Sequence, residues 1–281
     1  MAQLSTVGVA VREFYRELPF NMAVDEAEQV AIGMSGDAIK GQFPILVPYL
    51  TFGKRVIDVG CGTGWLANNV QKNFMCRVAG IDFNPVAIER ARKTAEMLNL
   101  KTRFEVTNIF EYEPEARFDV ALSFGALHHT GDCIGAVKRV LQELLVPRGV
   151  ALIGLYHADG RAPFLRHFRI LREKGTAEAE LIAEFGRLHP SVAGDDVLLR
   201  SWFRDQVLHP HETQHTLEEM WGVVEAAGGR IVAASINDFN PISDPRLLFK
   251  AEKGLARDAE EALKEGRYFP GFFYFLAEAP G

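Results

Sequence analysis

Cysteine is scarce in this 281-residue sequence, and the three cysteines present, Cys61, Cys76 and Cys133, lie far apart. They form no C-x-x-C pair, so their spacing indicates neither a zinc site nor a disulfide framework. We therefore expect a reducing, cytoplasmic setting. Arg12 and Glu13 precede any long apolar run, which argues against a signal peptide. No apolar stretch approaches the ~20 residues that a membrane span requires.

Basic residues are outnumbered, with 31 Lys and Arg against 37 Asp and Glu, and the pI is about 5.8. A general nucleic-acid binder usually carries a basic surface, so this balance argues against one and leaves only a local basic patch open. Hydrophobic residues make up 48% of the chain, which predicts a packed globular core. Because no Pro/Gly/Ser-rich linker or internal repeat divides the chain, we expect a single domain over residues 1–281.

Strand and helix patterns alternate from Arg55 to about residue 157. Short apolar runs typical of buried strands are separated by longer stretches with helical periodicity. The expected strands are 55–60, 77–82, 102–108, 119–124 and 149–156, and the expected helices between them are 65–74, 85–98 and 132–145. This alternation predicts a doubly wound α/β sheet whose strands are mostly parallel.

The flanking segments break this alternation. Residues 1–50 read as one or two amphipathic helices, interrupted at Pro19 and again near Gly33, and could form a lid that carries Tyr15 and Phe20. Residues 158–215 and 239–266 read as insertions, largely helical at 160–175, 177–189 and 255–266. Between and after them we expect a helix at 216–228 and strands at 230–237 and 268–280.

The most informative motif is DVGCGTGW, residues 58–65, in which Gly60, Gly62 and Gly64 follow a strand and precede a helix. Glycines here permit a tight turn and let a ligand approach the backbone closely. A nicotinamide or flavin fingerprint would place a further glycine where this chain has Trp65. Asp82 ends the next strand, where a carboxylate can accept hydrogen bonds from both hydroxyls of a ribose.

The ordered motifs DVGCGTGW, GIDFNP, TNIFEY, FDVALSFGALHHT and LLVPRGV are similar to those of the class I S-adenosylmethionine-dependent methyltransferases. The resemblance covers roughly residues 54–157, which would be the cofactor-binding core. It implies a Rossmann-like, seven-stranded, mostly parallel sheet with helical insertions, and S-adenosyl-L-methionine as cofactor.

The resemblance also implies a cofactor-binding role for ten residues: Asp58, Gly60, Gly62, Gly64, Asp82, Phe83, Asn108, Ile109, Ser123 and Phe124. Asp58 would help to hold the methionine ammonium group, and Asp82 would hold the ribose with Phe83 beside it. Asn108 would border the adenine; the family often has aspartate there, but asparagine keeps an acceptor oxygen. Ser123 would line the methionine end through its backbone.

Methyl transfer from a sulfonium is an in-line displacement, in which the enzyme aligns the nucleophile and excludes water. An oxygen or nitrogen acceptor often also requires a base, and histidine suits that task near neutral pH. The candidates are His128, our first choice by position, then His129, Tyr156 with its neighbour His157, and His211. Each could instead be a packing residue, and an activated carbon or sulfur acceptor would require no base.

The segment HPHETQHT contains H-E-x-x-H, with His211 and His215 at the spacing of the zinc-protease signature. That signature requires both histidines on one face of a helix. Thr216 and Glu219 form a capping box, which predicts that the helix starts only at Thr216. We therefore predict neither a zinc protease nor a bound metal. Three interpretations of residues 209–215 stay open: a loop lining an acceptor pocket, a structural or solvated loop, and a metal site of another kind.

Together these features predict a methyltransferase that acts on a small molecule, with the two insertions building the acceptor pocket. Its partners would include no membrane, and nucleic acid is disfavoured. Alternatives are an RNA or protein methyltransferase, a non-catalytic cofactor-binding partner subunit, and S-adenosylmethionine chemistry other than methyl transfer. The sequence indicates no particular oligomeric state.

Overall fold

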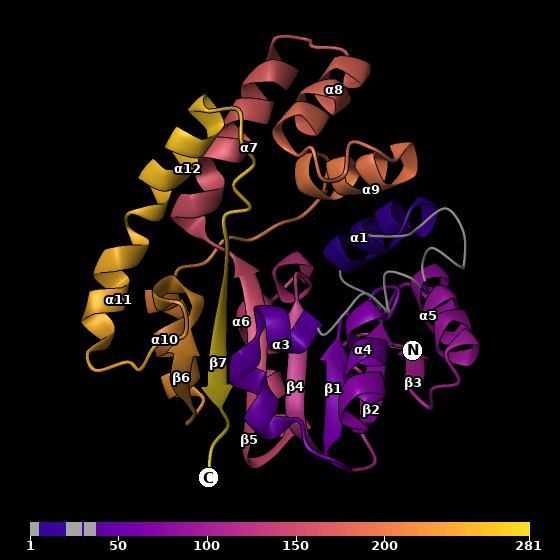
Figure 1. The fold of residues 1–281 in the computed structure, drawn as a ribbon. Coiled ribbons are helices and arrows are strands. Elements are labelled where there is room, and N and C mark those ends of the chain that lie inside the picture. Colours follow the sequence, from indigo (N-terminus) through magenta and orange to yellow (C-terminus); the bar gives the residue numbers. More distant parts are fainter. Residues whose placement is uncertain (1–5, 21–29, 31–37) are drawn as a thin grey trace.

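The computed structural model describes residues 6–20, 30 and 38–281. A seven-stranded sheet forms its centre, with the strand order β3-β2-β1-β4-β5-β7-β6 (Figure 1). Within the described residues, β7 runs antiparallel to its neighbours and the other strand pairs are parallel. The strands are β1 Arg55–Val59, β2 Arg77–Asp82, β3 Arg103–Val106, β4 Phe118–Phe124, β5 Leu145–Tyr156, β6 Arg230–Ala234 and β7 Phe272–Glu278. The predicted doubly wound, mostly parallel fold is confirmed.

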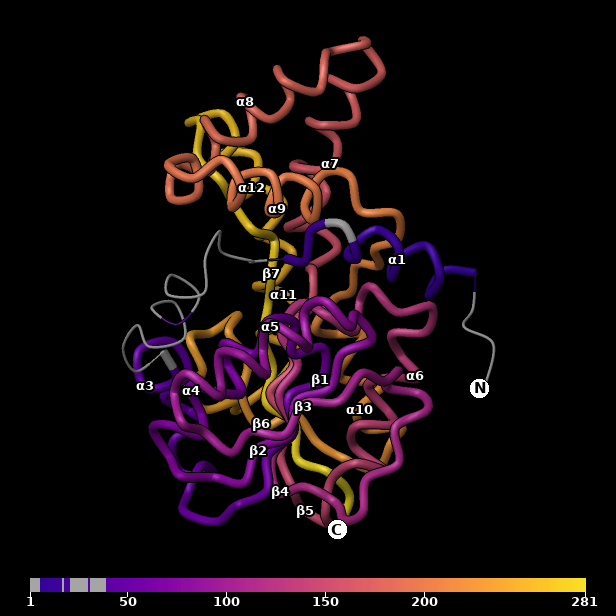
Figure 2. The backbone as a smooth tube through the Cα atoms, turned by 90° about the vertical axis from the view of Figure 1, so that its right-hand side faces the viewer, coloured from indigo at the N-terminus to yellow at the C-terminus, as the bar shows by residue number. Residues whose placement is uncertain are grey.

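Helices cover both faces of this sheet, as the turned view in Figure 2 shows. Successive side chains of a strand point to opposite faces, so Val56 of β1 packs in one core and its neighbour Ile57 in the other. The first core lies under α3 Ala38–Gln42, the 3-10 helix η1 Pro44–Tyr49, α4 Trp65–Phe74 and α5 Pro85–Met97. The second lies under α6 Cys133–Arg139 and α10 Leu217–Ala226.

Element boundaries near the sheet differ from the predictions in several places. The strand expected at 230–237 ends at Ala234, because residues 235–237 form a 3-10 helix, and the strand expected at 268–280 spans only Phe272–Glu278. The α-helical part of α6 ends at Arg139 and continues as the π-helical segment η3 Val140–Leu144. Strand β5 then starts at Leu145 rather than at residue 149, because Leu145 pairs with Phe118 before the register shifts. Strand β3 ends early at Val106, since Asn108 already begins a turn with its carbonyl accepting from the backbone N–H of Glu111.

The N-terminal prediction is confirmed in part. Helix α1 spans Thr6–Glu17 and ends before Pro19, as expected. The second break expected near Gly33 lies outside the described residues. In Figure 1 α1 lies between α9 and the end of the sheet at which β1 and β4 terminate. This position places the N-terminal helix beside the carboxyl ends of the parallel strands.

A third layer of helices stands beyond those carboxyl ends (Figure 1). It consists of α7 Ala158–Glu173, α8 Glu178–Leu188, α9 Asp196–Val207 and α12 Leu255–Lys264. Phe164, Phe185 and Phe203 form the centre of a separate small core that holds this layer together. The sequence analysis missed α9 and α11 Pro245–Glu252. The starts of both helices could have been predicted from the sequence, because each follows an aspartate, Asp195 or Asp244, whose side chain accepts hydrogen bonds from backbone N–H groups of the first turn.

The two ends of the insertion, residues 158–214, lie side by side at the carboxyl end of β5. The backbone N–H of Ala158 donates to the carbonyl of His215 at 2.9 Å, and the N–H of His215 donates to the carbonyl of Tyr156 at 2.9 Å. His157 caps α7, because its Nδ1 accepts from the N–H groups of Asp159 and Gly160. Its Nε2 therefore carries the proton and donates to Glu252 at 2.9 Å. His157 is thus a structural residue at the base of the insertion.

None of the helices within the described ranges is long and apolar enough to cross a membrane.

Candidate active site

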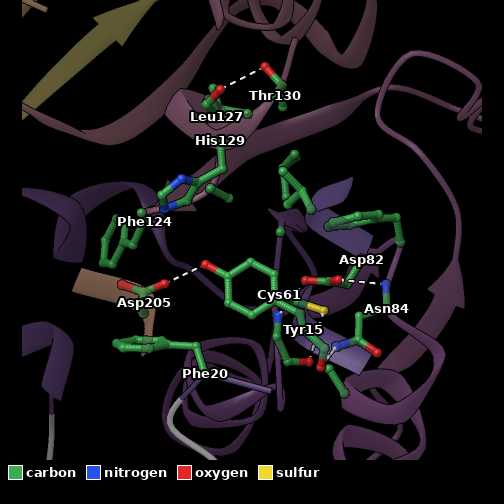
Figure 3. Close-up of a pocket in the computed structure, with 18 of the residues that line it drawn as sticks. Tyr15, Phe20, Cys61, Asp82, Asn84, Phe124, Leu127, His129, Thr130 and Asp205 are labelled. Carbon is green, nitrogen blue, oxygen red and sulfur yellow. Dashed lines mark hydrogen bonds between the residues drawn. The ribbon is translucent and has the colours of Figure 1, made fainter. Parts of the chain in front are cut away.

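A cavity of about 1010 Å³ opens at the carboxyl ends of β1, β2 and β4. The strand order reverses between β1 and β4, and ligands of open α/β sheets bind at such a switch point. Residues of the N-terminal segment and of the insertion close the cavity from the other side, among them Tyr15 of α1, Phe20 just after it, and Asp205 (Figure 3). Ligand pockets typically measure ~300–1,000 Å³, so this cavity lies at the upper end of that range.

The three glycines of the turn after β1 have different surroundings. A Cβ on Gly60 would lie 2.1 Å from the Cβ of Ala126, and one on Gly64 would lie 2.7 Å from the Cβ of Ala91. A Cβ on Gly62 would meet nothing within 4 Å. All three have positive φ, which glycine adopts without strain. Gly60 and Gly62 lie on the cavity wall and Gly64 does not, so only Gly62 presents unfilled space to a ligand.

Asp82 lies on the cavity wall and also holds the glycine turn. One carboxylate oxygen accepts from the N–H of Gly62 at 2.9 Å, and the other accepts from the N–H of Asn84 at 2.8 Å. Burial raises the pKa of Asp82, while the backbone N–H groups of Asn84, Gly62 and Phe83 oppose that rise. A carboxylate offers about four acceptor positions, so Asp82 retains capacity for hydroxyl groups of a ligand.

Two predicted cofactor residues lie beneath the wall rather than on it. Asp58 is 3% exposed and accepts from the N–H of Ala67 at the start of α4. Burial raises the pKa of Asp58 to about 7, and the nearby Asp82 adds to the rise. The hydroxyl of Ser123 donates to the carbonyl of Val59 at 2.9 Å. In this structure both side chains support the turn from behind.

The remaining predicted cofactor residues, Phe83, Asn108, Ile109 and Phe124, all lie on the cavity wall. The side-chain oxygen of Asn108 accepts from the N–H of Phe110 at 3.1 Å, so this asparagine stabilises its own turn. The Phe124 ring packs against Tyr274 with a centroid separation of 5.2 Å. Phe83, Asn108 and Ile109 border the cavity beside β2, and Phe124 borders it at the end of β4.

His129 lies on the cavity wall in one defined protonation state. Its Nδ1 lies 2.9 Å from the carbonyl oxygen of His211, and a carbonyl can only accept, so Nδ1 carries the proton. Burial lowers the pKa of His129, which keeps the ring neutral with its lone pair on Nε2. The ring of His209 stacks on it at 3.7 Å, and burial lowers the pKa of His209 to about 2.

His128, the first choice by position, lies behind the wall. It is fully buried, neither ring nitrogen has a hydrogen-bond partner among the described residues, and burial holds its pKa well below the usual value. Its ring packs against Tyr156 at 4.3 Å. Tyr156 itself reaches the cavity wall, whereas His211 does not; the Nε2 of His211 faces the carbonyl of Thr130 at 3.1 Å. Of the four predicted catalytic residues, the structure brings His129 and Tyr156 to the cavity.

The H-E-x-x-H segment is not helical, and α10 begins after it at Leu217. The side-chain oxygen of Thr216 accepts from the N–H of Glu219 at 3.0 Å, which confirms the predicted cap. Glu219 does not reach back to complete the box; its carboxylate bonds to Nδ1 of His215. Glu212 instead pairs with Arg161. Among the described residues, no group of three or more His, Cys, Asp or Glu side chains could hold a metal.

A buried polar network at the insertion side of the cavity was missed by the sequence analysis. The Gln206 amide group donates to the hydroxyl of Tyr156 and, at 2.6 Å, to Asp205. Its oxygen accepts from Arg161 at 3.0 Å and from Tyr268 at 2.9 Å. All four bonding positions of this amide are therefore used, and its orientation is fixed. The readable signal was the pair Asp205-Gln206 within the helical stretch SWFRDQV.

A family model described as a methyltransferase domain matches residues 50–207. An enzyme named ubiquinone biosynthesis O-methyltransferase from Rhodopseudomonas palustris is 30% identical over 110 residues, which covers 39% of this chain and 43% of the relative. This chain thus spans less than half the length of that relative.

Two solved structures share the fold. A methyltransferase from Mesorhizobium loti has a TM-score of 0.51 at 20% identity, covering 87% of this chain and 99% of its own. Magnesium protoporphyrin IX methyltransferase from Synechocystis with bound S-adenosylhomocysteine has a TM-score of 0.50 at 13% identity, covering 99% and 89%.

Proposed function

This chain belongs to the class I S-adenosylmethionine-dependent methyltransferases, and from that premise we propose that it methylates a small molecule. The main support for this proposal is one continuous cavity, which has the glycine turn at one end and residues of the third helical layer at the other. Gly62 and Asp82 lie on the sheet side, and Asp205 and Tyr268 lie on the insertion side. A concave space lined from both sides suits a compact acceptor better than an extended polymer.

The residues on the sheet side fit S-adenosylmethionine. Gly62 has open space where a side chain would be, and Asp82 keeps acceptor capacity beside it, which suits the ribose hydroxyls. Asp58, Gly60, Gly64 and Ser123 would act indirectly, by holding the turn in shape. When bound, S-adenosylmethionine supplies an electrophilic methyl group on a sulfonium.

His129 would act as the general base in this scheme. Its Nδ1 proton is held by the carbonyl of His211, so the free lone pair on Nε2 can take a proton from the acceptor. Tyr156 complements it, because its oxygen already accepts from Gln206 and its own O–H is left to orient the acceptor. Both residues would align the nucleophile while the helical layer excludes water.

The curated relatives support a small-molecule acceptor without identifying it. The Rhodopseudomonas palustris enzyme is named for O-methylation in ubiquinone biosynthesis. The aligned 110 residues cannot include the whole cavity, whose wall runs from Gly8 to Tyr274 in the sequence. The acceptor therefore has to be inferred from this chain's own side chains. We also keep the cytoplasm as the proposed location, because Cys61, Cys76 and Cys133 are free thiols.

The test uses methyl-labelled S-adenosylmethionine with an extract of the source cell, separated into macromolecules and small molecules by ultrafiltration. Enzyme-dependent label in a small molecule that chromatography separates from S-adenosylmethionine is expected. Label in RNA or protein would overturn the small-molecule acceptor. Tight binding of S-adenosylhomocysteine without label in any fraction would favour a non-catalytic, cofactor-binding subunit.

A further inference from the structure

Asp205 places a carboxylate on the wall of the cavity although the residue is only 5% exposed. It belongs to α9, and in Figure 3 its side chain points into the same space as His129 and Tyr15. One carboxylate oxygen accepts from the hydroxyl of Tyr15, and the other accepts from Gln206 at 2.6 Å. A carboxylate has about four acceptor positions, so two remain for a ligand.

Arg161, a buried cation that influences Asp205, is paired with another carboxylate. Arg161 is fully buried and forms a forked pair with Glu212, with bonds of 3.1 and 2.9 Å. Its remaining contacts go to Gln206 and to the faces of aromatic rings. No Lys or Arg within the described ranges forms an ion pair with Asp205. Because Arg161 is paired with Glu212, Asp205 has no ion-pair partner among the Lys and Arg residues of the described ranges.

A buried carboxylate without a counter-ion is costly, so such a group either holds a proton or awaits a cation. Burial is the largest influence on the pKa of Asp205, and it raises that pKa. Its two hydrogen bonds come from neutral donors, which favour the charged form without supplying positive charge. The site is therefore suited to a ligand that brings a positive charge with it.

Aromatic rings surround the same end of the cavity. Phe20 packs on Trp202 with a centroid separation of 4.9 Å, and His189 packs on both Trp202 at 4.9 Å and Tyr268 at 4.3 Å. All four residues lie on the cavity wall. Aromatic faces attract organic cations, and the attraction strengthens where water is excluded. A carboxylate among aromatic rings is thus a site for an organic ammonium group.

We propose that the methyl acceptor is an amine that enters this cavity as an ammonium ion, with Asp205 as its counter-ion and the aromatic rings around its apolar part. This inference rests on the proposed methyl transfer and names its substrate class. Nε2 of His129 takes one N–H proton from the ammonium ion. The freed nitrogen lone pair forms the bond to the methyl carbon while the S–C bond breaks and its electrons stay on sulfur. The products are a methylated ammonium ion, protonated His129 and neutral S-adenosylhomocysteine.

The first test compares 2-phenylethylamine with 2-phenylethanol, two probes of similar size that differ in charge near neutral pH. Their affinities are measured by calorimetry on the whole chain saturated with S-adenosylhomocysteine. The amine should bind about tenfold more tightly or better, since a buried ion pair would replace an uncompensated charge. Equal affinity, or tighter binding of the alcohol, would overturn the proposal, and this comparison requires no variant.

The second test assigns the preference to Asp205. Asp205→Asn keeps the shape and one acceptor oxygen, and it should remove the preference for the amine while affinity for S-adenosylhomocysteine stays within about twofold. Asp196→Asn, at an exposed position of the same helix, is the matched control and should behave as the unmodified chain. If Asp205→Asn retains the preference, or weakens only S-adenosylmethionine, the carboxylate serves the sulfonium or the fold and the proposal fails.

The third test first removes unreacted S-adenosylmethionine by chromatography and then passes the labelled product over a cation exchanger at acidic pH. Retained label that disappears with Asp205→Asn supports an amine acceptor. Unretained label would reject the amine and leave methyl transfer standing. If no fraction is labelled, methyl transfer itself is rejected, and the calorimetric comparison then decides on its own whether Asp205 binds ammonium groups.

Discussion

The hydroxyl of Tyr15 donates a hydrogen bond to Asp205, which lies 190 residues later in the chain. Two further bonds hold α1 in place: Arg204 donates to the carbonyl of Phe14 at 3.0 Å, and the side chain of Asn84 donates to the carbonyl of Tyr15 at 3.0 Å. Helix α1 therefore joins the insertion to the turn after β2. Tyr15 also lies on the cavity wall, so these hydrogen bonds fix one side of the cavity.

Replacing Tyr15 with phenylalanine should weaken acceptor binding more than cofactor binding. The variant removes one donor from a buried carboxylate, and a hydrogen bond to a charged group contributes about 1.5–3 kcal/mol, or roughly tenfold or more in apparent affinity. Rates of label transfer at varied acceptor concentration, with calorimetry for S-adenosylhomocysteine, would measure the two effects. Tyr49→Phe, at an exposed position, is the control. Equal losses for acceptor and cofactor would contradict the expectation.

Gly62→Ala and Gly64→Ala should impair the protein in different ways, one by weakening cofactor binding and the other by destabilising the fold. At Gly64 the new Cβ would collide with Ala91 and Phe104, so the thermal midpoint should fall by several degrees, as about 2 kcal/mol or more would cause. At Gly62 the Cβ has space, and only the positive φ costs about 1–2 kcal/mol. Gly62→Ala should instead lose most of its affinity for S-adenosylhomocysteine. Thermal unfolding and calorimetry on both variants would reveal the contrast, and similar profiles for the two would refute it.

Asp82→Ala should weaken S-adenosylhomocysteine binding by about tenfold to a hundredfold. Two effects combine, because the carboxylate is the expected partner of the ribose hydroxyls and also fixes the N–H of Gly62. Calorimetry would provide the affinity. Asp132→Ala is a useful comparison, since this exposed residue borders the cavity but its side chain caps α6. An unchanged affinity of the Asp82 variant would remove the basis for the cofactor assignment.

His129→Gln should lower kcat by about a hundredfold to ten-thousandfold, the usual contribution of a positioned base. Affinity for S-adenosylhomocysteine should not change. Burial lowers the pKa of His129, so the ring stays neutral to a lower pH than an ordinary histidine does. The kcat/KM of the unmodified chain should therefore fall only when the pH drops below the ordinary range of histidine. His167→Gln, in α7 and away from the cavity wall, is the control. A rate that is insensitive to His129→Gln would assign the base elsewhere.

Asp58 makes the fold less stable as the pH rises. Burial raises its pKa to about 7 from 3.8, so the folded chain keeps a proton that the unfolded chain loses. Stability should thus fall between about pH 4 and 7, and Asp58→Asn should be more stable than the unmodified chain at pH 8 by about 1–3 kcal/mol. At pH 4 the advantage should vanish. Denaturant unfolding at both pH values would measure it.

Asp119 provides a control of opposite sign for that experiment. Burial raises its pKa, but the hydrogen bonds from Lys54 and from the N–H of Arg55 outweigh burial and leave the pKa below its usual value. Its ionised form stabilises the fold above the ordinary aspartate range, and this contribution is lost as the pH falls through the lowered pKa. Asp119→Asn should therefore be destabilising at pH 8. If both variants shift in the same direction, the assignment for Asp58 is wrong.

The central sheet could be predicted because its signals are local. Apolar runs such as RVIDV end at glycines or acidic residues, and the alternation with helices specifies parallel strands. The choice between His128 and His129 could not be made in this way. Both lie in the 3-10 helix Leu127–His129, where successive side chains point about 120° apart, so adjacent histidines face different surroundings. The contact between Tyr15 and Asp205 depends on packing between distant segments, and no local pattern encodes it.

The closed base of the insertion has a consequence for how such a protein can change. The two ends of segment 158–214 are held together by backbone contacts among Tyr156, His157 and His215. The segment therefore leaves the sheet and returns to it at the same place. Lengthening or shortening a segment whose ends already meet changes the entropic cost of loop closure little, because that cost grows only slowly with segment length. The helices of residues 158–214, which we propose to line the acceptor side, could thus be exchanged while the strands keep their order and the glycine turn keeps its geometry. One scaffold can in this way acquire new acceptors without refolding its donor half.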